Sequence, residues 1–244
     1  DTWFSSALWP FATLGWPNKK SKDYVNFYPT QFLSTARDIL NLWVSRMIFS
    51  GMEFTGKAPF KDVYIHATVL TKDGRRMSKS LGTGIDPIEL IEKYGADATR
   101  FGLIYQAMGG QDIRFNEDIL VTGKKFCNKI WNASRFVLMQ LENIKGVSVK
   151  DISKLKPKTS EDKKIINRTK SVFKSIEKDI NGYKFGQAAH TMYDFFWHDF
   201  CDVYIEYAKL KDDTNTKEIL ISVLSASLKI MHPFIPFATE EIYS

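Results

Sequence analysis

The first hundred residues alternate short β-like stretches with a longer helix-like stretch. The stretches 28–34 and 62–70 are rich in β-branched and aromatic residues, which favours strands, and the second runs into the turn signal Asp73-Gly74. Between them, apolar residues recur at helical spacing over 37–54 until glycine and proline interrupt the pattern. Strand, helix and strand in this order predict a parallel α/β unit.

From residue 116 the pattern changes to helical periodicity and keeps it to the end. The candidate helices cover 116–143, 160–180, 185–209 and 216–231, and a last one starts near Pro236. Such a series, joined by short connections, predicts an antiparallel helical bundle. The predicted fold class is therefore α/β followed by all-α.

This change of pattern divides the chain into an α/β domain, 1–110, and a helical domain, 111–244. Two strands are too few for a stable parallel sheet, so we expect further strands from chain that precedes Asp1 or from another molecule. The first residues carry neither an initiator methionine nor a signal peptide. We therefore expect the chain to begin within a domain or to be a processed product.

The composition is that of a folded, water-soluble protein. Of the 244 residues, 44% are hydrophobic and 14% aromatic, which excludes disorder for most of the chain. Cys127 and Cys201 are too far apart for a paired-cysteine metal motif and too few for a disulfide framework, so we expect a cytoplasmic protein without a protein-bound metal. No apolar run reaches the roughly 18 residues that a membrane-spanning helix needs.

Positive charge is concentrated in one part of the chain. The stretch 145–178 holds eleven Lys and Arg against four Asp and Glu, a local charge of +7, although the whole chain carries only +6. Such a block can bind a phosphate backbone, and it can equally be a solvated helix face next to an exposed linker at 144–159.

The segment 73–84, with the sequence DGRRMSKSLGTG, carries the clearest chemical signal. It contains two arginines, a lysine, three hydroxyl side chains and three glycines, and it lies between a predicted strand and a helix that opens at Asp86-Pro87. Such a loop can offer cations, hydroxyl donors and backbone N–H groups to a polyphosphate. Its order is not that of a P-loop. A basic surface loop or a phosphorylation site is the alternative.

The stretch Arg76–Ser80 resembles the lysine-rich signature loop of the class I aminoacyl-tRNA synthetases. Other segments resemble the same class in the same order, and the likeness is strongest to the valyl-tRNA synthetase family. These segments are 1–11, 35–47, 94–101, 126–133, 201–206 and 231–241.

The resemblance implies that valine and ATP form valyl-adenylate, from which the acyl group passes to valine tRNA. Catalysis would consist of positioning and of stabilising charge on the phosphates, with Mg²⁺ as the usual counter-ion of ATP. Lys79 is the expected catalytic cation, which contacts the departing pyrophosphate. The expected ATP-binding residues are Arg76, Met77, Ser78, Lys79, Ser80, Asp38 and His66.

By the same resemblance, Trp3, Ile39 and Trp43 would line the pocket for the valine side chain. A narrow apolar slot excludes larger side chains but discriminates weakly against an isostere such as threonine. Apolar residues at helical spacing are more commonly core, which is the alternative for these three. For Asp38 the alternative is a helix N-terminal acid, and for His66 a hydrogen-bonded core histidine.

For tRNA, the expected contacts lie in the basic stretch. They are Lys154, Lys156, Lys158, Lys163 and Lys164. His190 and His198 are interpreted as bundle packing or surface, and His232 as the mark of a helix end.

The sequence departs from the family at several positions. The His-x-Gly-His segment of class I enzymes is absent, Arg76 stands where lysine is more common, and Thr83 replaces an asparagine. We therefore expect a C-terminal fragment that is inactive by itself. The alternatives are a tRNA-binding module without catalysis, a purely structural helical domain, and a fragment of a related enzyme such as isoleucyl-tRNA synthetase.

Overall fold

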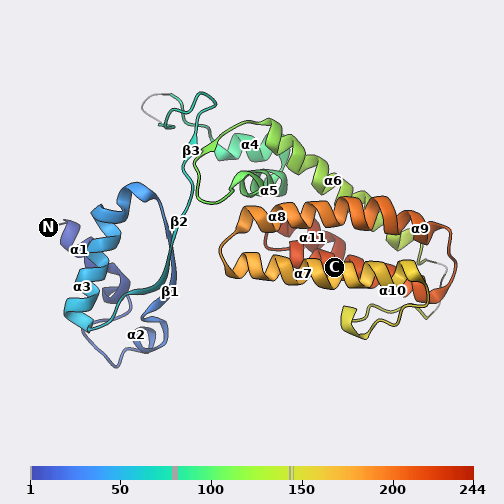
Figure 1. The fold of residues 1–244 in the computed structure, drawn as a ribbon. Coiled ribbons are helices and arrows are strands. Elements are labelled where there is room, and N and C mark those ends of the chain that lie inside the picture. The colour runs from blue at the N-terminus through green and yellow to red at the C-terminus, as the bar shows by residue number, and fades with distance from the viewer. Residues whose placement is uncertain (1, 79–81, 143, 145) are drawn as a thin grey trace. The chain divides into compact units, whose positions relative to one another are not determined.

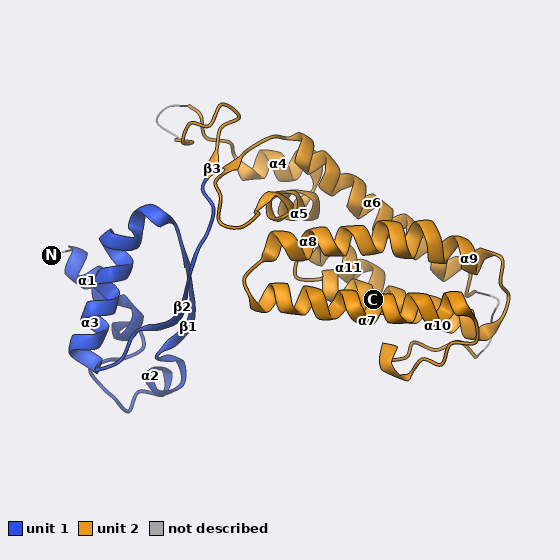
Figure 2. Cartoon of the chain, viewed as in Figure 1, with its two compact units in different colours: residues 1–68 blue, residues 69–244 orange. Residues whose placement is uncertain are grey.

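The computed structural model describes residues 2–78, 82–142, 144 and 146–244 (Figure 1). The chain divides into two compact units, residues 1–68 and 69–244 (Figure 2). Within the described residues, no helix is both long enough and apolar enough to cross a membrane.

Unit 1 is built from three α-helices and a short parallel sheet. Its small core contains Val44, Met47 and Phe60, against which Leu33 and Trp43 pack. The elements are α1 (Thr2–Ala12), α2 (Lys22–Phe27), β1 (Thr30–Thr35), a 3-10 turn η1 (Arg37–Ile39), a π-helical segment η2 (Leu40–Val44), α3 (Ser45–Thr55) and β2 (Phe60–Ile65).

The predicted strand–helix–strand unit is confirmed. Strands β1 and β2 pair in parallel, with Thr30 opposite Phe60 and Thr35 opposite Ile65. The connecting helical stretch is less regular than the spacing predicts, because a 3-10 turn and a π-helical segment precede α3. A π-helical segment changes the direction of side chains within a helix, and such segments are frequent at functional sites.

The prediction of a single strand over 62–70 is wrong. β2 ends at Ile65, and a separate strand, β3 (Val69–Leu70), begins unit 2 and pairs in parallel with β4 (Ile113–Arg114). Beyond β2, the His66 amide donates to the Thr35 carbonyl at 3.0 Å. Because β1 ends at Thr35, the chain beyond His66 has no further partner in that sheet and joins a second one.

Unit 2 is mainly helical, and its helices agree with the predicted series. The four long helical stretches predicted from 116 onward appear at nearly the predicted bounds. The elements after β3 and β4 are α4 (Pro87–Tyr94), α5 (Ala96–Gln106), α6 (Asp118–Met139), a 3-10 turn η3 (Ile152–Lys154), α7 (Ser160–Asn181), α8 (Phe185–Asp194), a π-helical segment η4 (Phe195–Ile205), α9 (Glu206–Lys209), α10 (Thr214–Met231) and α11 (Pro236–Tyr243).

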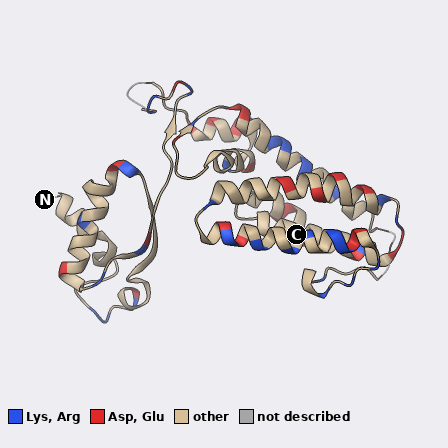
Figure 3. Cartoon of the chain, viewed as in Figure 1, with Lys and Arg blue, Asp and Glu red and all other residues tan. Residues whose placement is uncertain are grey.

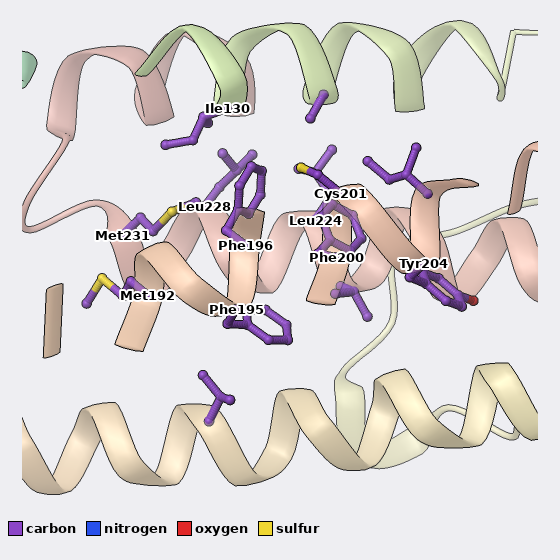
Figure 4. Packing of buried hydrophobic residues seen from close by; sticks show 14 of the residues in the cluster. Ile130, Met192, Phe195, Phe196, Phe200, Cys201, Tyr204, Leu224, Leu228 and Met231 are labelled. Atoms are coloured by element: carbon purple, nitrogen blue, oxygen red, sulfur yellow. The ribbon is translucent and has the colours of Figure 1, made fainter. Parts of the chain in front are cut away.

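The core of unit 2 lies between the long helices. Phe195, Phe196 and Phe200 of η4 are at most 2% exposed and point among side chains of the neighbouring helices, such as Ile130 and Leu224 (Figure 4). The predicted helix over 185–209 is one uninterrupted run of α8, η4 and α9. The fold class predicted from the sequence, α/β followed by a helical bundle, is confirmed.

The stretch 146–159 is only partly the exposed linker that the sequence predicts. Most of its residues are exposed, but Leu155 is 7% exposed and belongs to the bundle core. The Lys150 amide donates to Ser222 Oγ at 3.0 Å, and Lys150 Nζ binds Glu218 at 2.7 Å. Interactions with α10 therefore hold this stretch to the bundle.

Helix α5 was not predicted as a separate element, and it is the one most closely packed against α6. Gly123 of α6 lies so near α5 that a Cβ on it would stand 2.4 Å from the Ala98 carbonyl oxygen. Gly102 of α5 approaches the Ile119 backbone in the same way, at 2.9 Å. Only glycine permits approaches this close.

Candidate functional site

The segment 73–84 begins as a tight hairpin that continues β3. The Thr71 amide donates to the Arg75 carbonyl at 2.8 Å, and Leu70 forms an antiparallel bridge with Arg76. Asp73 caps the turn, because it accepts from Thr71 Oγ1 at 2.5 Å and from Arg75 Nε at 2.6 Å. These hydrogen bonds lower the pKa of Asp73, with the Thr71 hydroxyl as the largest cause, so the carboxylate is held charged.

The loop is closed by hydrogen bonds between Ser78 and Thr83. Thr83 Oγ1 accepts from the Ser78 amide at 3.0 Å, and the amides of Thr83 and Gly84 donate to the Ser78 carbonyl at 3.1 and 3.2 Å. Thr83 therefore fixes the base of the loop. Lys79 and Ser80, two of the predicted site residues, lie outside the described residues.

Met77 anchors the loop on a small apolar cluster. The cluster consists of buried Leu90, Phe115 and Leu120, with Met77 and Leu103 packed against it. The loop is thus attached at its base to α4, α5 and the start of α6. Arg76 lies on the exposed side of this hairpin.

In unit 1, the structure brings Trp3 and Trp43 to the same contact between α1 and η2–α3. Trp43 Nε1 donates to the Ser6 carbonyl at 3.3 Å, and Arg46 stands over the Trp3 ring at 5.2 Å. Trp3 and Ser6 are three apart on one helix face, as are Trp43 and Arg46. Trp3 remains 41% exposed, so it is not the enclosed core residue that the alternative interpretation requires.

Ile39, Asp38 and His66 lie around the carboxyl end of β1. Ile39 is half-buried at the end of η1, and Asp38 is exposed on the same turn. His66 follows β2 directly, is exposed, and has Nδ1 3.0 Å from the Ala67 carbonyl oxygen. His66 is therefore not a core histidine. In parallel α/β sheets, ligands bind beyond the carboxyl ends of the strands, which is where this group lies.

The five predicted tRNA-contacting lysines are all exposed. Three precede α7, and Lys163 and Lys164 occupy its first turns, where Lys164 pairs with Glu161 at 3.8 Å. Figure 3 shows Lys and Arg along α7 and the chain that leads into it. The same first turns contain buried Asp162, which accepts from the Tyr204 hydroxyl at 2.7 Å.

The remaining histidines pack in the bundle, lie at its surface or mark a helix end, as the sequence predicts. His190 stacks on Tyr105 with ring centroids 3.6 Å apart, and His198 pairs with Asp202 at 3.2 Å. His232 follows the last residue of α10 and binds Thr239 Oγ1 at 2.9 Å. Among the described residues, no three His, Cys, Asp or Glu side chains are grouped so that they could hold a metal ion.

Sequence reasoning missed two polar side chains that connect elements. Lys217 of α10 is fully buried, its Nζ donates to Gln140 Oε1 at 2.8 Å and to the Ala208 carbonyl at 2.9 Å, and burial lowers its pKa. Asp97 of α5 is 8% exposed and accepts two backbone N–H groups of α11. The only sequence signal for Asp97 is that it lies within the segment 94–101, which resembles the synthetases.

Comparisons with known proteins divide the chain in two. Residues 1–116 match the model for "tRNA synthetases class I (I, L, M and V)". Residues 162–244 match the model for "Anticodon-binding domain of tRNA ligase".

Among curated proteins, the chain is similar to bacterial valine–tRNA ligases along its whole length. It is 50% identical to the valine–tRNA ligase of Bacillus cereus and 48% identical to that of Geobacillus stearothermophilus, each over 250 aligned positions. The match covers 100% of this chain and 28% of each relative, so the chain spans little more than a quarter of their length.

Among solved structures, the fold is similar to larger synthetases. A leucyl-tRNA synthetase from Agrobacterium radiobacter, solved with tRNA, matches with a TM-score of 0.78 at 17% identity over 100% of this chain and 30% of the other. A Mycobacterium tuberculosis methionyl-tRNA synthetase, solved with methionyl-adenylate, matches with a TM-score of 0.76 at 17% identity over 95% of this chain and 47% of the other. At these identities the likeness establishes the fold alone.

Proposed function

Residues 1–116 of this chain belong to the class I tRNA synthetases and residues 162–244 to the anticodon-binding domains of tRNA ligases, and from this premise we propose that the chain is part of a valine–tRNA ligase. The observation that carries the proposal is the 50% identity to a valine–tRNA ligase across the whole chain, signature loop included. The substrates proposed are valine, ATP and valine tRNA, in a cytoplasmic enzyme.

In the proposed first step, the valine carboxylate attacks the α-phosphate of ATP, pyrophosphate leaves, and valyl-adenylate forms. The role proposed for Lys79 is to stabilise charge on the departing pyrophosphate, with Arg76, Ser78 and Ser80 as further donors. The hydrogen-bonded base of the loop, Ser78 to Thr83, supports this role because it fixes both ends of the segment that carries the lysine. Met77 would place the loop through its apolar contacts.

For unit 1, we propose that Asp38 binds the ATP ribose and that His66 lies near the adenine. Their exposure beyond the ends of β1 and β2 supports these roles. Trp3, Ile39 and Trp43 would form the apolar slot for the valine side chain. Mg²⁺ is proposed only as the ion that ATP brings with it, where it would offset phosphate charge.

A chimeric enzyme tests the proposal. This chain replaces the matching stretch of the Bacillus cereus valine–tRNA ligase, and the purified chimera is assayed for charging of valine tRNA with valine and with isoleucine. We expect charging with valine, whereas this chain alone should not support valine-dependent pyrophosphate exchange, because it spans only 28% of that enzyme.

The matched control is the parent Bacillus enzyme. A folded chimera, judged by circular dichroism, that charges neither amino acid would overturn the proposal. Preference for isoleucine would favour the alternative enzyme, and tRNA binding without any charging would favour a non-catalytic tRNA-binding module.

A further inference from the structure

Helix α5 is joined by three hydrogen bonds to the corner between α10 and α11. Asp97, at the second position of α5, accepts from the Phe237 amide through Oδ1 at 3.2 Å and from the Ala238 amide through Oδ2 at 2.6 Å. One turn later, Arg100 Nη2 donates to the Pro233 carbonyl at 3.0 Å. We call this set of contacts the α5–α11 clamp.

The clamp supplies the hydrogen-bond acceptors that the start of α11 lacks. The cap residue, Ile235, has no side chain that can accept a hydrogen bond, and Pro236 has no N–H. The amides of Phe237 and Ala238 would otherwise be unpaired at a helix N-terminus. A carboxylate is favoured there because the positive end of the helix dipole faces it. Asp97 therefore serves as an N-cap that comes from a different helix, about 140 positions earlier in the chain.

The same short helix shares an apolar cluster with the signature loop. Leu103 of α5 packs with Met77 on the cluster of Leu90, Phe115 and Leu120. The close approach of Gly123 to Ala98 fixes α5 against α6. Because packed interiors do not deform continuously, a displacement of α11 would be transmitted to α5 and to the base of the loop.

We propose that Asp97 and Arg100 are positioning residues for the transfer step, which hold the anticodon-binding region in fixed register with the signature loop. This inference rests on the function proposed above. With the clamp intact, tRNA bound by the helical region presents its acceptor end at a fixed place relative to the loop. With the clamp released, each region keeps its own activity, but transfer of the acyl group to tRNA slows. Adenylate formation involves no tRNA, so it does not depend on the clamp.

The first test needs no assumption about function. Hydrogen–deuterium exchange of the full 244-residue chain is compared between the wild type and Asp97→Asn, in which one carboxylate oxygen becomes an NH₂ donor. The amides of Phe237 and Ala238 should exchange at least about tenfold faster. The matched control is Glu92→Gln, an exposed carboxylate on α4 with the same change of charge. Unchanged exchange in Asp97→Asn would overturn the clamp.

The second test uses the chimera. Asp97→Asn and Arg100→Ala should leave valine-dependent pyrophosphate exchange within about twofold and lower kcat for tRNA charging about tenfold. Arg100→Lys, which keeps a donor, should recover part of the loss, and Glu92→Gln should behave as the parent. An equal fall in exchange and charging would show general damage and overturn the positioning role, as would unchanged charging.

The two failures can be told apart. If the parent chimera charges no tRNA, the proposed function fails and the positioning role falls with it, whatever the amide exchange shows. If the parent chimera charges tRNA and the variants do not separate the two steps, only the positioning role fails.

Discussion

At the scale of single residues, Cys127 and Cys201 show how the bundle suppresses a reactive group. Burial, the largest cause, raises the pKa of each thiol to about 12. Only the thiolate reacts, so at pH 8 both cysteines should be modified by iodoacetamide at least about 100-fold more slowly in the folded chain than in urea. Mass spectrometry of timed samples measures this. Equal rates in both states would contradict the burial.

The same thiols predict how stability depends on pH. Their pKa is raised in the folded state, so the folded chain holds protons that the unfolded chain loses once the pH passes about 9. The contribution of the thiols is therefore complete below pH 9 and is lost as the pH rises toward 12. Urea titrations at pH 8 and pH 10 should show a smaller loss of unfolding free energy for Cys201→Ala than for the wild type. An identical loss in both would contradict the prediction.

Substitutions of two residues of the signature loop should have effects of different size in the chimera. Lys79→Ala should lower the rate of adenylate formation by about 10²–10³, the range for one lost electrostatic stabiliser, with little change in valine affinity. Arg76→Ala should have a smaller effect. Pyrophosphate exchange at varied valine concentration distinguishes a change in the rate of adenylate formation from a change in valine affinity. A defect of Lys79→Ala confined to valine affinity would contradict the role.

The residue types of the candidate site were accessible from the sequence because they form one contiguous motif, but their surroundings were not. The spacing of Ser78 and Thr83 gives no indication that the two close the loop. Nor does the helical spacing of Trp43 show that its indole bonds to Ser6, because that contact depends on how α1 packs. Lys217 has no signal at all, because its acceptors come from the residue that follows α6 and from α9.

At the scale of elements, long amphipathic helices were predictable because many residues repeat one period, whereas short elements decided by tertiary contacts were not. The break between β2 and β3 occurs where the partner strand β1 ends. The sequence of 62–70 gives no indication of that end. The π-helical runs η2 and η4 have the same apolar spacing as ordinary helices. Helix α5 is short and surrounded by other elements, so its polar and apolar positions do not separate into two clear faces.

The contact between α5 and α6 predicts a large effect of a single methyl group. Gly123→Ala should destabilise unit 2 by about 2 kcal/mol or more, because the added Cβ would meet the Ala98 carbonyl and the backbones would have to separate. Lys125→Ala, an exposed position on the same helix, is the control and should change stability by less than about 0.5 kcal/mol. Urea denaturation followed by circular dichroism measures both. Equal stability of the two variants would contradict the prediction, because it would mean that α5 and α6 can move apart at little cost in free energy.

At the scale of the whole molecule, the surplus of positive charge predicts how the affinity of the chain for tRNA depends on salt. The exposed lysines at 154, 156, 158, 163 and 164 should give weak binding whose affinity falls steeply with salt, with log K linear in log salt. Titration of valine tRNA and an unrelated tRNA at two salt concentrations measures affinity and preference. Substitution of Lys156, Lys158 and Lys163 by Gln should reduce the slope by about 2–3, while the same change at Lys19, Lys20 and Lys22 of unit 1 serves as the control.

No binding even at low salt would show that the basic stretch is only a solvated surface. Binding without preference would support the charge argument and leave base reading to other residues.

The predicted domain boundary at residue 110 stays a prediction. The two compact units are divided between residues 68 and 69. This division follows how densely the residues pack and does not mark where one family ends and the next begins.

The α5–α11 clamp also sets an order of events during synthesis. Asp97 leaves the ribosome about 140 residues before the amides that it caps, and at ~5–20 residues per second this gap lasts roughly 7–28 seconds. Helix formation takes microseconds or less, so α5 and α6 can form long before α11 exists. Throughout that interval the Asp97 carboxylate faces water. The register between the loop-bearing part and the last helix is therefore fixed only when translation of this stretch is complete, which makes the clamp one of the last contacts of the fold to form.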